Sequence, residues 1–249
     1  MDSVLGKYLS SRRAETTILK SLWLVLAEPS VSQAPDGIIQ VDSMKDFAGQ
    51  PKRWRGIGGM KFREVGGQQL LVFKPDASGR MQMFTEDPVE IFQRVSWGKN
   101  KTVWEIALGF VTLVFGLTLL LWPVAALLRR HYKRPLPLDP IQRKLRLLMK
   151  LACAVDLGAL IAFASILVYG FSNLSVLSAR LDPWLRLVQL LFVIGLLGTI
   201  AMLYASFRLW RNSSKGLWTT IYSAGLVLAS FVFIWIVASS RILQASLKY

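Results

Sequence analysis

The chain has 249 residues, of which 53% are hydrophobic and 18% charged, with a formal net charge of +15, one Cys and one His. Average soluble domains carry about 25% charged residues, so this chain is poor in charged and rich in apolar side chains. Such a composition excludes the disordered and collagen-like classes. A single Cys excludes an intramolecular disulfide and a Cys-based zinc site, and a single His excludes a His-rich metal site. A membrane protein, or an unusually apolar basic protein, remains.

The first 101 residues predict a small extracytoplasmic α+β domain. Thr16–Leu26 places apolar residues at helical spacing and predicts an amphipathic helix of about three turns. The apolar run Leu22–Ala27 inside it is shorter than the 7–15 residues of a signal-peptide core, and it starts well inside the chain. We therefore interpret it as part of the folded domain.

Short strand-like runs separated by turn residues follow the expected helix. Their separators are Pro35-Asp36-Gly37, Gly66-Gly67 and the segment from Pro75 to Gly79, which are typical of tight turns. Several short strands joined in this way predict an antiparallel sheet or a small lipocalin-like barrel. The predicted strands are Ser30–Gln33, Ile38–Asp42, Met60–Val65, Gln69–Lys74, Met81–Thr85 and Val89–Gln93.

Residues 102–249 predict an all-α bundle of four transmembrane helices. Four uncharged apolar runs each reach the roughly 20 residues that a helix needs to cross a bilayer. None has the polar stripe of a soluble amphipathic helix. The runs are Ile106–Leu128, Leu157–Ala179, Leu187–Phe207 and Gly216–Ser240, within helices expected at about 104–128, 151–179, 185–208 and 216–240.

The charges between these runs predict the orientation. Residues 102–249 hold fifteen of the thirty Lys and Arg residues but four of the fifteen acids. The first and third connections are the most basic, and short basic loops stay in the cytoplasm. The domain formed by residues 1–101 and the C-terminus are then extracytoplasmic. The bases of those two connections are Arg129, Arg130, Lys133, Arg134, Arg143, Lys144, Arg146 and Lys150, and Arg208, Arg211 and Lys215.

Other features receive structural interpretations. Asp156 is the acid that lies well inside an apolar region, and we expect it to lie near the inner face with a local partner such as a base or a headgroup, although ion translocation stays open. His131 is expected in a solvated loop, Cys153 in inert packing, and Gly56–Gly59 in a turn. Trp104, Trp184, Trp210 and Trp218 are expected as interfacial anchors. The basic loop 129–150 could also hold anionic lipid. Nucleic acid is not an expected partner, because the bases lie between apolar runs rather than on a polar face.

Several segments in order resemble the C-terminal part of membrane-bound serine hydrolases of the β-lactamase/penicillin-binding type. The stretch 8–41 resembles the family's Y-x-S-x-R-x-x-x-T-T segment, which continues to a D-G turn. The stretch 70–92 resembles its F-x-x-D-x-x-G-R-V hairpin, and Phe92–Trp97 its F-x-R-V-P-W entry into the first span. The resemblance covers essentially the whole chain and implies a lipocalin-like domain followed by a membrane region.

In that family the chemistry is located upstream of the region that this chain resembles. Ser96-Trp97-Gly98-Lys99 spells the S-x-x-K motif, but it directly precedes the first span, and the family has Pro at the Ser position. Tyr169 and Tyr222 lack the Asn of a Y-x-N motif, and Lys101-Thr102 is followed by Val103 instead of Gly. We therefore predict no catalytic, cofactor-binding or metal-ligating residue on this chain, and no cofactor.

The sequence thus predicts a non-catalytic membrane-anchoring region that holds a hydrolase domain at the outer face of the cytoplasmic membrane. Its expected partners are the lipid bilayer and a separately encoded β-lactamase-like hydrolase domain. An export-competent region is expected upstream, because the first residues contain no export signal. The alternative is a free-standing four-helix membrane protein with a partner- or ligand-binding outer domain.

Overall fold

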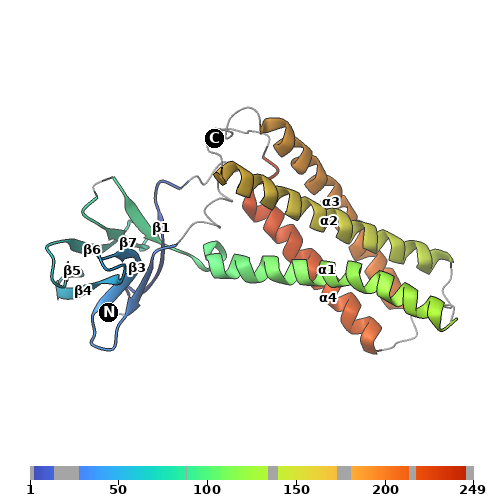
Figure 1. The fold of residues 1–249 in the computed structure, drawn as a ribbon, viewed down its shortest axis with the longest axis horizontal. Helices are drawn as coiled ribbons and strands as arrows, with labels where there is room; N and C mark the ends of the chain where they lie inside the picture. Colours follow the sequence, from blue (N-terminus) through green and yellow to red (C-terminus); the bar gives the residue numbers. More distant parts are fainter. Residues whose placement is uncertain are drawn as a thin grey trace. The chain divides into compact units, whose positions relative to one another are not determined.

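The structure is a computed structural model that describes residues 3–13, 28–87, 89–133, 140–172, 181–212 and 217–244 (Figure 1). The chain divides into two compact units, Met1–Trp104 and Glu105–Tyr249. The expected helix Thr16–Leu26 lies outside the described residues. The first unit contains a β-barrel and the second contains four long helices, so the α+β fold class predicted from the sequence is confirmed.

Eight antiparallel strands close into a barrel in which each strand pairs with its neighbours in sequence, and β1 pairs with β8. All six strands expected from the sequence are present, one with unchanged ends and the others with ends shifted by at most three residues. The strands are β1 Gly6–Ser10, β2 Ser30–Gln33, β3 Ile39–Lys45, β4 Pro51–Gly58, β5 Lys61–Glu64, β6 Leu70–Pro75, β7 Met81–Phe84 and β8 Ile91–Arg94.

Two strands, β1 and β4, were not predicted. In β4 only Trp54 is buried, and the positions around it hold Lys, Arg and Gly, so the strand has no apolar alternation for a sequence pattern to detect. In β1 the buried residues are three consecutive ones at its end, again without alternation. Both are recognised only from their pairing with neighbouring strands.

Side chains fill the barrel interior. Phe73 lies at its centre, with ring centroids 5.8 Å from Tyr8 and 5.5 Å from Phe62. The Tyr8 hydroxyl donates to the Val4 carbonyl at 2.8 Å, and burial raises the pKa of Tyr8 to about 12. Interior-facing positions of small barrels are filled in this way. The buried cluster consists of Val4, Tyr8, Val31, Ile39, Val41, Trp54, Phe62, Leu71, Phe73 and Met83.

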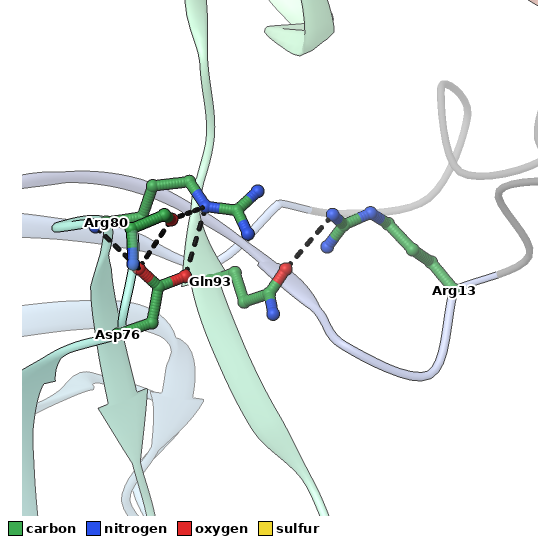
Figure 2. A network of polar contacts seen from close by, with 5 residues as sticks. Arg13, Asp76, Arg80 and Gln93 are labelled. Carbon is green, nitrogen blue, oxygen red and sulfur yellow. Dashed lines mark hydrogen bonds and ion pairs between the residues drawn. The ribbon is translucent and has the colours of Figure 1, made fainter.

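The turn between β6 and β7 is held by a single carboxylate (Figure 2). Asp76 Oδ1 accepts the backbone N–H groups of Ser78 at 2.8 Å and Arg80 at 2.9 Å and the Ser78 hydroxyl at 2.6 Å. Arg80 Nε donates to Asp76 Oδ2 at 3.1 Å. These hydrogen bonds favour the ionised carboxylate and lower the pKa of Asp76 to about 2.

The second unit is built of four long apolar helices that lie side by side in Figure 1. Each is long and apolar enough to cross a membrane, which makes the chain a multi-pass membrane protein as expected. Phe192 and Phe233 join α3 to α4, with stacked rings whose centroids are 6.2 Å apart. The helices are α1 Lys101–His131, α2 Pro140–Ser172, α3 Asp182–Asn212 and α4 Leu217–Ser240.

Two details of the helices differ from expectation. Helix α2 begins at Pro140, eleven residues before the expected start at 151, because the basic segment 140–150 continues the same helix. Trp104, expected as an interfacial anchor, has a buried side chain, and its Nε1 donates to the Gly98 carbonyl at 3.0 Å. Trp184 is exposed near the start of α3, as an anchor should be.

We predict that Trp54→Ala destabilises the barrel by about 3–5 kcal/mol, because it leaves a cavity in a filled interior. The matched control Phe47→Ala, at a fully exposed aromatic ring on the β3–β4 turn, changes stability by less than about 0.5 kcal/mol. Thermal unfolding followed by near-UV circular dichroism measures both. Equal effects of the two substitutions would contradict the assigned core.

We predict that the Asp76 carboxyl titrates near pH 2 in NMR spectra of the folded chain. Because its pKa lies below the ordinary value of 3.8, its contribution to stability is present above about pH 4 and is lost as the pH falls through 2. The unfolding temperature of the native chain should therefore fall more steeply over this range than that of Asp76→Asn. A titration midpoint near 3.8 would show that the turn hydrogen bonds do not form.

Candidate functional site

The start of α1 is held by a buried carboxylate from the barrel unit. Glu28 lies just before β2, and its Oε1 accepts the backbone N–H of Lys101 at 2.9 Å. Its side chain is 4% exposed. The first N–H groups of a helix have no partner within the helix, and the helix dipole favours a negative charge there. Glu28 satisfies both requirements at the first residue of α1.

A lysine from β1 completes this arrangement. Lys7 Nζ donates to Thr102 Oγ1 at 2.6 Å and to Asn100 Oδ1 at 3.4 Å, and it lies 3.6 Å from Glu28 Oε2. Asn100 Oδ1 also accepts the Thr102 N–H at 3.0 Å, which is the bond of an Asn helix cap. We call Lys7, Glu28, Asn100, Lys101 and Thr102 the junction cluster.

The role of Lys7 and Glu28 could not be predicted from the sequence, because both are isolated charges outside any motif. Asn100 followed two residues later by Thr102 at the start of an apolar run was the available signal of a helix cap. The cluster lies within the first unit, so the first turn of α1 belongs to the barrel unit. The barrel and the first predicted span are therefore joined through a specific set of contacts.

The S-x-x-K match lies on the turn between β8 and α1. Ser96 is exposed and precedes the short 3₁₀ helix Trp97–Lys99, where its side chain makes no capping hydrogen bond. This placement differs from the helix start beneath a sheet that a nucleophilic serine of that family type requires. Tyr222, one of the two tyrosines that lack the Asn of a Y-x-N motif, donates its hydroxyl group to Thr118 Oγ1 at 3.2 Å and so joins α4 to α1.

Asp156 lies at the midpoint of α2, six residues after Lys150, the last cation of the basic segment. It is fully buried, and its Oδ2 accepts the Thr199 hydroxyl of α3 at 2.8 Å. Its Oδ1 has no hydrogen-bond partner and packs against Gly195 of α3, where a Cβ would clash with it. The partner of Asp156 is thus a hydroxyl on the next helix, and neither a base nor a headgroup.

Small and sulfur-containing side chains surround this contact between α2 and α3. Cys153 is buried, and its Sγ lies 3.6 Å from Met202 Sδ. One turn along α3, a Cβ on Gly198 would approach the Cβ of Ala152 to 3.2 Å. Close approach at small residues, with an interhelical hydrogen bond, is the usual mode of helix packing in membranes.

The part of the chain that the structure describes contains no group of three or more His, Cys, Asp and Glu residues able to hold a metal ion.

His131, at the end of α1, is exposed and packs edge-on against Tyr132 at 5.1 Å between ring centroids. The turn expected at Gly56–Gly59 is shorter: Gly56, Ile57 and Gly58 lie in β4, and Gly59 with Met60 forms the turn to β5, both with positive φ.

We predict that Gly195→Ala destabilises the helical unit by about 1–3 kcal/mol, because the added methyl group has to displace the buried Asp156 carboxyl. The control is Gly158→Ala on α2, where an added Cβ meets no atom within 4 Å. Thr199→Val should cost less, about 0.6 kcal/mol, the average value of an interhelical hydrogen bond in membranes. Unfolding in detergent micelles measures all three, and a neutral Gly195→Ala would contradict this packing.

The comparisons with known proteins give no family. No family model, no curated protein and no solved structure matches the chain. The function is therefore inferred from the residues themselves.

Proposed function

We propose that this chain is a non-catalytic membrane-anchoring region of a β-lactamase-like serine hydrolase. It holds a hydrolase domain at the outer face of the cytoplasmic membrane. The junction cluster is the observation that carries this proposal, because it fastens an extramembrane barrel to the first turn of a membrane helix. The order of sequence segments that resemble such hydrolases supplies the identity of the attached domain.

The junction is suited to a load-bearing connection. Lys7, on β1, and Glu28, just before β2, approach the start of α1 from two different segments of the barrel unit, and the Glu28 side chain is almost fully withdrawn from water. Removing one partner of a buried ion pair costs about 3–5 kcal/mol, because the other charge is left unpaired. The first turn of the helix is therefore fixed to the barrel instead of being joined by a flexible linker.

The distribution of cations supports an extracytoplasmic barrel. The end of α1 and the start of α2 carry a dense set of cations, and Lys150 lies 4.4 Å above the Trp122 ring across the two helices. Short basic segments remain in the cytoplasm. The start of α1, and with it the barrel, then lies on the outer side. The described cations of this end are Arg129, Arg130, Lys133, Arg143, Lys144, Arg146 and Lys150.

The filled barrel interior favours a scaffold over a carrier of small molecules. Lipocalin-type barrels that carry a ligand hold it in the lumen, whereas ten buried side chains occupy the interior here. A partner domain would therefore contact the outer surface of the barrel. The same feature is compatible with a free-standing membrane protein whose outer domain binds a partner, which is the alternative function.

The genomic region upstream of Met1 separates the two functions. The hydrolase proposal expects a reading frame there with a signal peptide, an S-x-x-K motif and a Y-x-N motif. Co-expression of that hydrolase with this chain should place the hydrolase in the membrane fraction, and omission of this chain should release it. A serine-reactive fluorophosphonate probe should label the hydrolase and not this chain. Without such a reading frame, the free-standing alternative is favoured.

We predict that Glu28→Ala weakens the attachment of α1 to the barrel and makes the segment 95–104 more accessible to protease in detergent. The substitution removes the acceptor of the Lys101 N–H and the ion pair of Lys7 together. Asp42→Ala, an exposed carboxylate that accepts the Ser30 N–H at 2.7 Å, serves as the control. Cleavage rates at 95–104 that match in native and Glu28→Ala chains would show that the cluster is not a fastening.

A further inference from the structure

The β4–β5 hairpin has an outward face made almost entirely of cations. Trp54 and Phe62 point into the core, so the alternate residues point outward. These are Arg53 and Arg55 on β4 and Lys61 and Arg63 on β5, and all four are exposed. Arg53 pairs with Asp36, which leaves three cations to account for.

Arg55 lies directly opposite Arg63 in the antiparallel register. Directly opposed residues have Cβ atoms about 4.5–5.5 Å apart, and like charges in such a pair are destabilising. Neither arginine, nor Lys61, has a hydrogen bond or ion pair with any residue that the structure describes. The fold thus places two arginines at directly opposed strand positions, and the structure shows no ion pair for either among the residues that it describes.

An oxyanion between the two arginines would remove this repulsion. Each guanidinium presents a planar fork of N–H donors that matches phosphate or carboxylate oxygens, and two forks from neighbouring strands can grip one tetrahedral phosphate. Lys61, on the same strand and face as Arg63, adds a third cation beside that position. The outward-facing positions of β4 and β5 themselves carry no carboxylate; Glu86, which accepts the Leu70 N–H at 3.1 Å, belongs to the β7–β8 connection.

The position of the hairpin distinguishes a soluble ligand from a bilayer. In the closed strand order, β4 and β5 lie four strands away from β8 and β1, on the opposite side of the barrel. The chain enters α1 from β8, and Lys7 of β1 and Glu28 fix that entry. Within the barrel, the cationic face therefore lies on the side opposite the strands that lead into α1.

We infer that the β4–β5 hairpin binds a soluble polyanion whose charges are phosphate groups, with one phosphate held between Arg55 and Arg63. Lys61 contacts a neighbouring phosphate of the same polyanion. The ribbon is convex and exposed on its outward face, which suits a repeating charged polymer recognised by charge and fork geometry. The function goes beyond anchoring and is independent of the hydrolase assignment.

The test uses the full chain in uncharged detergent and measures binding of inorganic polyphosphate by isothermal titration calorimetry at two salt concentrations. Arg55→Gln/Arg63→Gln should weaken binding about tenfold or more, because charged hydrogen bonds to phosphate are lost. Arg12→Gln/Lys45→Gln removes two exposed cations elsewhere and should change affinity much less. Arg55→Lys/Arg63→Lys keeps the charge but loses the forks, and should bind with intermediate affinity.

Other outcomes would overturn the inference. Equal weakening by the control double variant would show a general charge effect. Equal binding of polyglutamate at matched charge would exclude a preference for phosphate. Binding of the chain, held in nanodiscs of uncharged lipid, to vesicles of phosphatidylglycerol that depends on Arg55 and Arg63 would assign the face to a bilayer. Folding is checked separately, since Arg55→Gln should leave the unfolding temperature unchanged or raise it by relieving the repulsion.

Discussion

The structure depends on one constraint, which is the attachment of a water-soluble barrel to a helix that has to enter hydrocarbon. A membrane helix satisfies its own backbone groups except at its ends, where the first N–H groups need outside acceptors. Here Asn100 and Glu28 supply acceptors for Thr102 and Lys101, and Lys7 balances the charge of Glu28. One lysine and one glutamate, both far from α1 in the sequence, thus hold the first turn of α1 within the barrel unit.

The two units accommodate their polar groups in different ways. The barrel is stabilised by a filled aromatic interior and by turns such as the one that Asp76 holds with four hydrogen bonds, so its charges stay at the surface. The helical unit has little hydrophobic driving force between helices, because lipid is as apolar as their side chains. Small residues therefore allow close approach at Gly195 and Gly198, and the hydroxyl of Thr199 satisfies half of the Asp156 carboxyl.

Charge has a different meaning in each part of the chain. Around the α1–α2 connection no ion pair joins the described cations to an acid, and Lys150 lies 4.4 Å above the Trp122 ring. We propose that these cations set the orientation of the chain in the membrane. On the barrel four of the described cations pair with a carboxylate: Lys7 with Glu28, Lys52 with Glu64 at 3.0 Å, Arg53 with Asp36, and Arg80 with Asp76. Arg55 and Arg63, by contrast, lie directly opposite one another, and the fold provides no carboxylate partner for either among the described residues.

The sequence by itself determined the class of this protein: four helices long enough to span a bilayer, their basic connection, and six of the eight strands. These features depend on local composition and periodicity, which a linear pattern records directly. Tertiary structure decided the rest. Strands β1 and β4 exist because neighbouring strands pair with them, Asp156 finds Thr199 forty-three residues away, and Glu28 reaches Lys101 across seventy-three. No local pattern encodes such contacts, because each requires two distant segments to be brought together by the closed barrel or by helix packing.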